Sequence, residues 1–172
     1  RDMKVRSDAF NALGRITGNE AFNTQLAIIS EWQKHSADQE SFAPTVREFI
    51  YEPSHLGRPK VLRDAARKQK GAAKVVTYRI ALQLEQSPLA NDYLRRMMGD
   101  IISRGTKNAE LLTAIGDSGS AGHRELVSTA AKSKDAALAK VAKATLAKLN
   151  DVPATGDDDK RLIVQLGHNE AT

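Results

Sequence analysis

The apolar residues of this chain recur three or four positions apart, and eleven glycines and five prolines interrupt that pattern at short intervals. This spacing is typical of amphipathic helices, whereas half-buried strands alternate apolar and polar residues. The pattern therefore predicts a protein built from short helices. They are expected over residues 2–16, 20–34, 42–51, 59–68, 72–85, 88–103, 108–115, 122–133 and 135–149.

The clearest of these helices is the last one, over residues 135–149. Asp135 stands where its side chain can cap the first turn and where the helix dipole favours an acid. The helical period puts five residues on a buried face and three lysines opposite them. The two sets are Leu138, Val141, Ala142, Thr145 and Leu149, and Lys140, Lys143 and Lys148. We interpret the lysines as an ordinary solvated face.

The predicted helices also recur in pairs. Every second helix ends near residue 14, 51, 85, 115 or 149, so successive ends lie about 30 to 37 residues apart. Such a period is typical of an α-solenoid, in which stacked hairpins bury a core that one hairpin cannot bury alone. We expect an all-α, right-handed α-solenoid of about four to five helical hairpins, with an irregular helical bundle as the alternative.

Two stretches of the chain resemble HEAT repeats. Residues 2–14 resemble the family's second helix, with an Asp in the turn, then Val-Arg, then Ala and Leu on the packed face. Residues 111–120 resemble its Leu-Leu-x-Ala-Leu-Gly helix end, residues 126–127 its following first helix, and residues 135–149 its Asp-initiated second helix. Ala-Lys-Val at 139–141 replaces the family's Val-Arg, so no Asp–Arg ladder is expected there.

The resemblance covers about a third of the chain, and residues 42–103 are compatible with it. It implies a curved array that holds a protein, or in some members a nucleic acid, along one face, and it implies no common chemistry. Residues 1–150 are then a HEAT-like helical repeat domain, and residues 151–172 an acidic linker and tail. The strand-like residues 162–166 would be a strand or the start of a further domain, and we expect the chain to belong to a longer one.

A strongly basic segment lies in the middle of the sequence. Residues 57–79 hold eight cations and one acid, Asp64, which gives a net charge of +7; because the whole chain carries +5, the remainder carries −2. Like charges repel at helical spacing, so their retention favours an anionic partner, which Arg can bind bidentately. A face that merely keeps the protein soluble is the alternative. The candidate binding residues are Lys60, Arg63, Arg67, Lys70, Lys74 and Arg79.

Three functions fit these features. The preferred one is a non-catalytic protein–protein interaction scaffold, whose curved helical surface uses the basic hairpin to bind an acidic protein partner. The second is sequence-nonspecific nucleic-acid binding through backbone contacts, although aromatic residues, at 5%, are too few for a stacking platform. The third is a helical-domain fragment of a larger lipid-carrying protein, whose helix ends residues 111–119 resemble.

The sequence indicates no reaction centre. It contains no cysteine, which excludes disulfides, thiolate zinc sites and cysteine nucleophiles. Its four histidines lack metal-ligand spacing, and it has no glycine-rich phosphate loop. We therefore expect no enzyme activity, no cofactor and no metal. No stretch approaches the ~20 apolar residues of a membrane span, and a cytoplasmic location is only a default expectation.

Overall fold

The computed structural model describes residues 3–16 and 18–151. This part of the chain is all-α, with nine α-helices, two short 3₁₀ helices and no strand. The α-helices are α1 (Met3–Gly14), α2 (Asn19–Trp32), α3 (Ser36–Ile50), α4 (Pro59–Lys68), α5 (Gly71–Gln86), α6 (Asp92–Arg104), α7 (Ala109–Ser118), α8 (Arg124–Ala130) and α9 (Ala136–Asp151). The 3₁₀ helices are η1 (Pro53–Gly57) and η2 (Ala121–His123).

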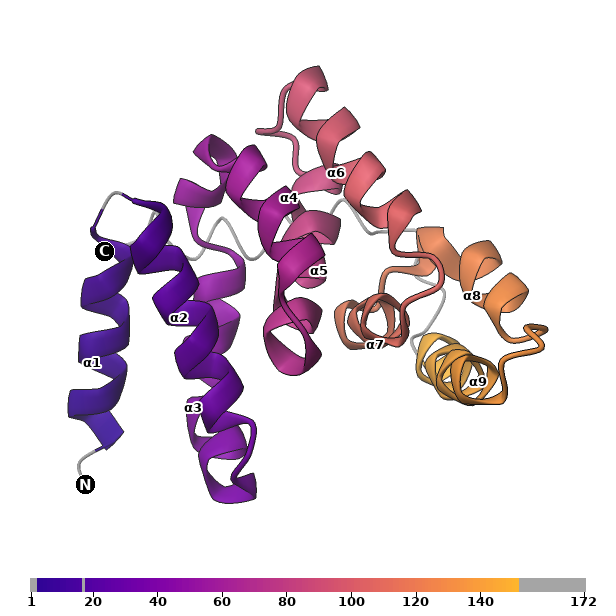
Figure 1. Cartoon of the computed structure of the whole chain (residues 1–172), viewed down its shortest axis with the longest axis horizontal. Helices are drawn as coiled ribbons and strands as arrows, with labels where there is room; N and C mark the ends of the chain where they lie inside the picture. The colour runs from indigo at the N-terminus through magenta and orange to yellow at the C-terminus, as the bar shows by residue number, and fades with distance from the viewer. Residues whose placement is uncertain (1–2, 17, 152–172) are drawn as a thin grey trace.

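The helices follow one another along the long axis of the molecule, from α1 at one end to α8 and α9 at the other (Figure 1). Helices α1, α2 and α3 pack on one another, and both α2 and α3 also contact α5. Helix α5 lies at the centre, where it contacts α4, α6 and α7 as well. Helix α7 packs on α9, and α9 packs on α8. Each helix therefore contacts mainly helices that are close to it in the sequence.

The core at the α1–α3 end is aromatic. The rings of Trp32 and Phe42 stack with their centroids 3.7 Å apart, and Phe10 lies against Trp32 at 5.0 Å. Phe49 meets Phe10 edge-on, with its centroid at 5.4 Å. His55, from η1, is fully buried edge-on against Phe49, and its Nε2 donates to the Phe49 carbonyl oxygen at 2.6 Å. Offset and edge-on contacts between such rings stabilise this end beyond the area they bury.

The core at the α7–α9 end is aliphatic. Leu112, Ile115, Val127 and Leu149 are fully or almost fully buried there. The predicted buried face of α9 is confirmed, since Ala142, Thr145 and Leu149 are buried and Leu138 and Val141 are partly buried. Buried Thr145 also donates from Oγ1 to the Leu112 carbonyl oxygen at 3.0 Å, which joins α9 to α7.

The prediction is accurate for the helices whose ends carry clear chemical signals. Helix α4 has the predicted bounds, with Pro59 in its first turn, where a missing N–H costs nothing. Asp135 caps α9 as expected: its Oδ1 accepts from the backbone N–H groups of Ala137 at 2.9 Å and Leu138 at 3.1 Å.

The predicted starts of α3 and α6, which were placed at or near prolines, are wrong. Helix α3 begins at Ser36, six positions before the expected start, and Pro44 lies inside it. Pro44 is exposed, so the carbonyl it leaves without a helical donor can be hydrated. Helix α6 begins at Asp92, not at Pro88, because Asn91 caps it by accepting from the Leu94 N–H at 2.9 Å. Pro88 occupies a turn in which Ser87 O accepts from Ala90 N at 3.1 Å.

Two further expectations lie at helix ends. The helix expected over residues 122–133 is shorter, because η2 precedes α8 and α8 ends at Ala130. The predicted linker, tail and strand fall on residues 152–172, outside the described residues, apart from Asp151, which is the last residue of α9.

Candidate functional site

Helix α4 presents one apolar face to the core and its cations away from it. Val61, Leu62, Ala65 and Ala66 are buried, as the helical spacing predicts. Arg63 is partly buried and Arg67 is exposed. Because the apolar face fixes the rotation of α4, both arginines are carried on the side that approaches α6.

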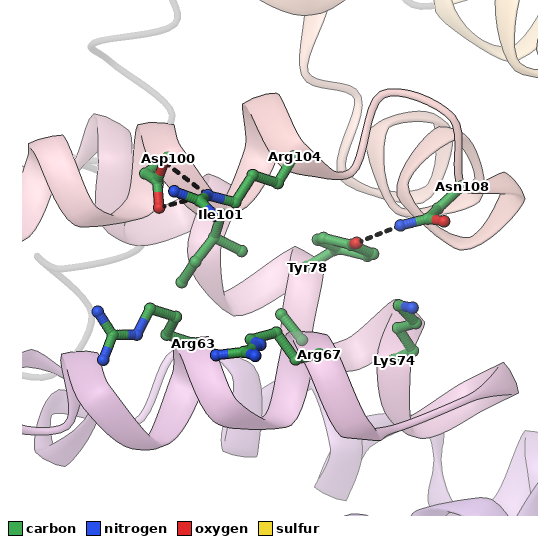
Figure 2. A pocket seen from close by; sticks show the side chains of 9 residues that line it. Arg63, Arg67, Lys74, Tyr78, Asp100, Ile101, Arg104 and Asn108 are labelled. Carbon is green, nitrogen blue, oxygen red and sulfur yellow. Dashed lines mark hydrogen bonds and ion pairs between the residues drawn. The ribbon is translucent and has the colours of Figure 1, made fainter.

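A pocket of about 360 Å³ lies where α4, α5 and α6 meet (Figure 2). We call it the basic pocket. In Figure 2 the cations of α4 and α5 lie along one side, with Asp100 and Arg104 of α6 across from them. Its lining residues are Arg63, Ala66, Arg67, Lys74, Tyr78, Asp100, Ile101, Arg104 and Asn108.

Three of the six predicted binding residues line this pocket and three do not. Arg63, Arg67 and Lys74 line it. Lys60 is exposed elsewhere on α4, and Arg79 is partly buried on α5. Lys70 lies outside α4, which ends at Lys68, and it has an extended backbone, with φ −135° and ψ 162°, as the residue before α5. The helical spacing of the cations therefore stops short of Lys70.

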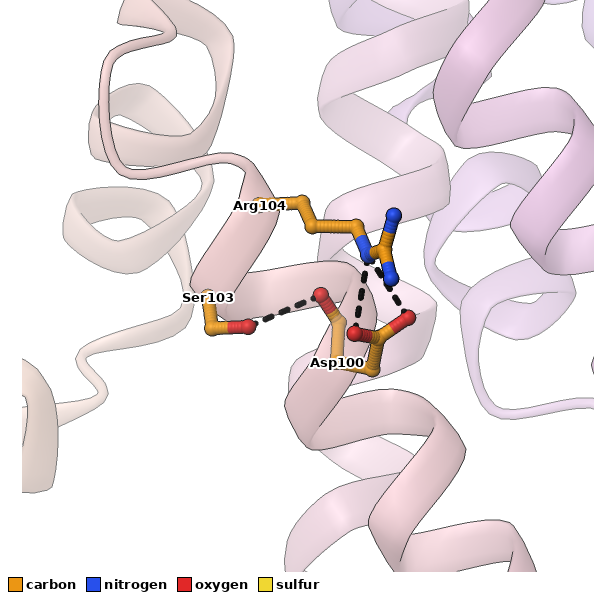
Figure 3. A network of polar contacts seen from close by, with 3 residues as sticks. All are labelled: Asp100, Ser103 and Arg104. Atoms are coloured by element: carbon orange, nitrogen blue, oxygen red, sulfur yellow. Dashed lines mark hydrogen bonds and ion pairs between the residues drawn. The ribbon is translucent and has the colours of Figure 1, made fainter.

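The pocket cations differ in whether they have a partner. Arg104 Nε donates to both carboxylate oxygens of Asp100 at 2.8 Å, and Ser103 Oγ donates to the backbone oxygen of Asp100 at 3.0 Å (Figure 3). Arg63, Arg67 and Lys74 form no ion pair with any residue that the structure describes. The Nε of Arg63 is buried without a hydrogen-bond partner. Three positive charges therefore face the pocket uncompensated.

Tyr78 and Asn108 form the polar wall of the pocket. Asn108 Nδ2 donates to Tyr78 Oη at 2.8 Å, so the hydroxyl keeps its own proton available for donation. Burial, together with the nearby charge of Glu110, raises the pKa of Tyr78, although the Asn108 hydrogen bond opposes the shift. The hydroxyl is therefore a neutral donor at physiological pH.

The Tyr78 ring is held in place by Gly105. A Cβ at position 105 would lie 2.8 Å from Tyr78 Oη and 2.9 Å from Cε1 and Cζ. The glycine at the end of α6 thus allows the ring to lie directly against the backbone. Tyr78 is buried, at 2% exposure, and nevertheless forms part of the pocket lining.

Sequence reasoning missed the residues of α6 and α7 that complete the pocket. Asp100 and Arg104 stand four positions apart, a spacing typical of an ordinary helical ion pair. Asn108 precedes α7, where Asn commonly caps a helix. Nothing local distinguishes these residues, because their role depends on α6 packing against α4.

Other kinds of site were sought over residues 3–16 and 18–151. No group of three or more His, Asp or Glu side chains there is placed to hold a metal ion. Every helix in that part of the chain is too short or too polar to cross a membrane.

Comparison with protein-family models, with curated proteins and with solved structures finds no match to this chain.

Proposed function

We propose that the chain is a non-catalytic interaction scaffold of HEAT-like helical hairpins, which binds an acidic segment of a protein partner at the basic pocket. The observation that carries the proposal is the convergence of Arg63, Arg67 and Lys74, without ion-pair partners in the described part of the chain, on one concave site. A solubilising face would keep its cations dispersed and hydrated. Here one Arg is partly desolvated, which costs free energy that a bound anion would offset.

The packing order of the helices supports the HEAT-like solenoid. In such arrays each repeat contacts its neighbours, and stability is close to a sum of local interfaces. The contacts of α1–α3, α5–α7 and α7–α9 follow that rule. Asp135 at the start of α9 and the left-handed Gly119, with φ 63°, at the end of α7 stand where the HEAT resemblance puts a helix start and a helix end.

A protein segment fits the basic pocket better than a nucleic acid does. Specific nucleic-acid interfaces spread over roughly 1,000 Å² or more, whereas these cations surround one small pocket. The ring of Tyr78 is buried against Gly105, so it offers no face on which a base could stack. Outside residues 57–79 the net charge is −2, which disfavours a long polyanion crossing the rest of the surface.

A binding experiment with charge-reversed variants tests the proposal. We expect a fluorescent peptide rich in Glu to bind the full chain at low salt, as measured by fluorescence anisotropy. R63E/R67E reverses two pocket cations and should abolish binding, because like charges then face the ligand. Circular dichroism establishes that the variant is folded. Should Arg63, which is partly buried, not tolerate reversal, R67E/K74E makes the same test.

The matched control is K60E/K68E. Lys60 and Lys68 are exposed on the same helix and do not line the pocket, yet the double variant changes the net charge equally. We expect it to keep most of the peptide affinity. Equal loss in both variants would mean that general charge, not the pocket, binds the peptide. A duplex DNA serves as the competing ligand. If the wild type bound it more tightly than the peptide, and if that affinity fell steeply with added salt, nucleic-acid binding would replace the proposal.

A further inference from the structure

The chemistry of the basic pocket indicates more than a general preference for acidic segments. Its cationic and neutral donors come from two neighbouring helices: Arg63 and Arg67 from α4, and Lys74 and Tyr78, beside Asn108, from α5. Two guanidinium groups can each donate a pair of hydrogen bonds to one tetrahedral or planar anion. One Asp or Glu carboxylate carries a single charge and would leave two of the three cations without compensation, whereas a dianion would leave one.

The size of the pocket limits the ligand. Sites for small ligands have volumes of about 300 to 1,000 Å³, and a pocket of about 360 Å³ lies at the lower end of that range. It has room for a charged side chain together with part of the segment that carries it. The densest charge that one side chain can bring is a phosphate monoester, which carries about −1.5 to −2 at pH 7 and has three acceptor oxygens.

The lining also argues against other sources of phosphate. Ala66 and Ile101 are the only aliphatic residues of its lining, which is too little apolar surface to cover an acyl chain. The diester phosphates of a nucleic acid carry one charge each and are spread along a chain, whereas the cations here line a single pocket.

We propose that the basic pocket holds the phosphorylated side chain of a phosphoserine or phosphothreonine within an acidic segment of the partner. Arg63 and Arg67 bind the phosphate oxygens, Lys74 adds a third positive charge, and the Tyr78 hydroxyl donates to a remaining oxygen. This inference rests on the proposed function, because it identifies the ligand of the same pocket.

Asp100 has a specific part in this arrangement. It is the acid of the pocket lining, and both its oxygens accept from Arg104. It therefore withholds a fourth cation and opposes a bound dianion. Removing its charge should release Arg104 toward the phosphate and tighten binding, which is the opposite of what most changes in a binding site do.

The first test compares three synthetic peptides on the full-length chain. They share one acidic sequence and differ at one position, which carries Ser, Glu or phosphoserine. We expect the phosphoserine peptide to bind roughly tenfold more tightly than the Glu peptide in anisotropy measurements, since each added charge-assisted hydrogen bond has an effect of that order. Equal affinity for the Glu and phosphoserine peptides would overturn the inference and leave the proposed function standing. Failure of all three peptides to bind would overturn both.

The second test is D100N against D117N. Both variants remove one carboxylate, but Asp117 pairs with Lys148 at the α7–α9 end, away from the pocket. D100N should bind the phosphoserine peptide roughly three- to tenfold more tightly than the wild type, whereas D117N should not change the affinity. Unchanged or weaker binding by D100N would contradict the part assigned to Asp100 and Arg104.

The third test separates phosphate from carboxylate by pH. The second proton of a phosphate monoester is lost near pH 6, and no histidine lines the pocket. Lowering the pH from about 7.5 to about 5.5 should therefore reduce the affinity of the protein for the phosphoserine peptide more than its affinity for the Glu peptide. An oligonucleotide without terminal phosphate and anionic vesicles serve as further probes. Binding of either one in preference to the phosphoserine peptide would assign the pocket to another class of ligand.

Discussion

Two sets of basic residues are placed in opposite ways: Arg63, Arg67 and Lys74 in the α4–α6 region, and Arg124 and Lys148 in the α7–α9 region. At the α7–α9 end, Lys148 Nζ lies 2.7 Å from Asp117 Oδ1, and Arg124 Nη2 donates to the Leu149 carbonyl oxygen at 3.0 Å. Around the basic pocket, Arg63, Arg67 and Lys74 have no ion-pair partner in the part of the chain that the structure describes. Composition alone cannot separate these two arrangements.

Under the proposed function, the difference separates cations that stabilise the fold from cations that would bind a ligand. A guanidinium at a helix C-terminus satisfies carbonyl groups that lack helical donors and complements the helix dipole. Cations that face one another without acids raise the free energy of the folded state until an anion binds. Stability and binding should therefore respond to different residues.

The largest expected effect concerns a third location, where a positive charge is excluded altogether. His55 is fully buried among aromatic rings, and burial, reinforced by nearby Arg58 and opposed by the hydrogen bond to Phe49, lowers its pKa to about 4. An unfolded chain protonates this histidine near pH 6.5, so the folded state binds fewer protons between those two values. Folding stability should fall by about 3 kcal/mol as the pH drops from 6.5 to 4, and His55 should have no such effect above that window.

Urea unfolding at a series of pH values measures this loss. Carboxylates also titrate below pH 5, so the contribution of His55 is the difference between the wild type and H55F, whose ring can keep the edge-on contacts with Phe22 and Phe49. H55F should show a flatter dependence between pH 6.5 and 4, while H35Q, at an exposed histidine, should follow the wild type. A parallel curve for H55F would show that the buried ring is not the acid-sensitive group.

The next largest effect is expected at Gly105, where one substitution should change both the folding stability and peptide binding. At Gly105 φ is −85° and ψ −2°, so alanine suits the backbone there and only the Tyr78 ring obstructs a Cβ. G105A should destabilise the chain by about 1 to 3 kcal/mol, because a buried ring must move. It should also weaken peptide binding, since the Tyr78 hydroxyl leaves the pocket wall.

The control for this prediction is G122A. A Cβ at Gly122 meets nothing within 4 Å, and the position is exposed on η2. The substitution should leave stability unchanged or raise it slightly. Thermal unfolding of both variants, followed by circular dichroism, decides the matter. Equal melting temperatures for G105A and the wild type would mean that Tyr78 adapts without cost.

The sequence predicted what depends on local chemistry. The helical period identified nine helices, and the apolar residues of α4 and α9 lie inward as that period requires. At two of the wrong boundaries, a proline was taken to mark the first turn of a helix, although it lies inside α3 or in the turn before α6. Proline inside a helix leaves the carbonyl four residues earlier without its donor, and at the exposed Pro44 water can reach that carbonyl.

Only some of the residues that line the pocket could be predicted from the sequence. Charge density pointed to Arg63, Arg67 and Lys74, because eight cations against one acid is visible in the sequence. Asp100, Arg104 and Asn108 come from segments more than 25 positions away, and packing of α6 on α4 brings them to the pocket. Lys60, Lys70 and Arg79 do not line it, and Lys70 lies beyond the end of α4.

The smallest expected effect tests the comparison of the two regions directly. R124M removes the donor to the Leu149 carbonyl and the hydrogen bond from Nη1 to Asn150 Oδ1, so it should destabilise the chain by about 1 kcal/mol. R67M removes an exposed cation that lies one turn from Arg63, and relief of that repulsion should leave stability unchanged or raise it by a few tenths of a kcal/mol. Both changes keep a long side chain and remove one charge, so they are matched in composition.

Unfolding in urea, which adds no ions, measures the two variants under the same conditions. Opposite signs for R124M and R67M would establish that the α7–α9 cations stabilise the fold while those of the basic pocket do not. If R67M were as destabilising as R124M, Arg67 would have a structural role, and its lack of a partner could not be attributed to a site kept open for an anion. The same measurements with added phosphopeptide extend the comparison. A ligand that binds the folded state stabilises it by mass action. R67M should lose most of this ligand-induced stabilisation, whereas R124M should keep it.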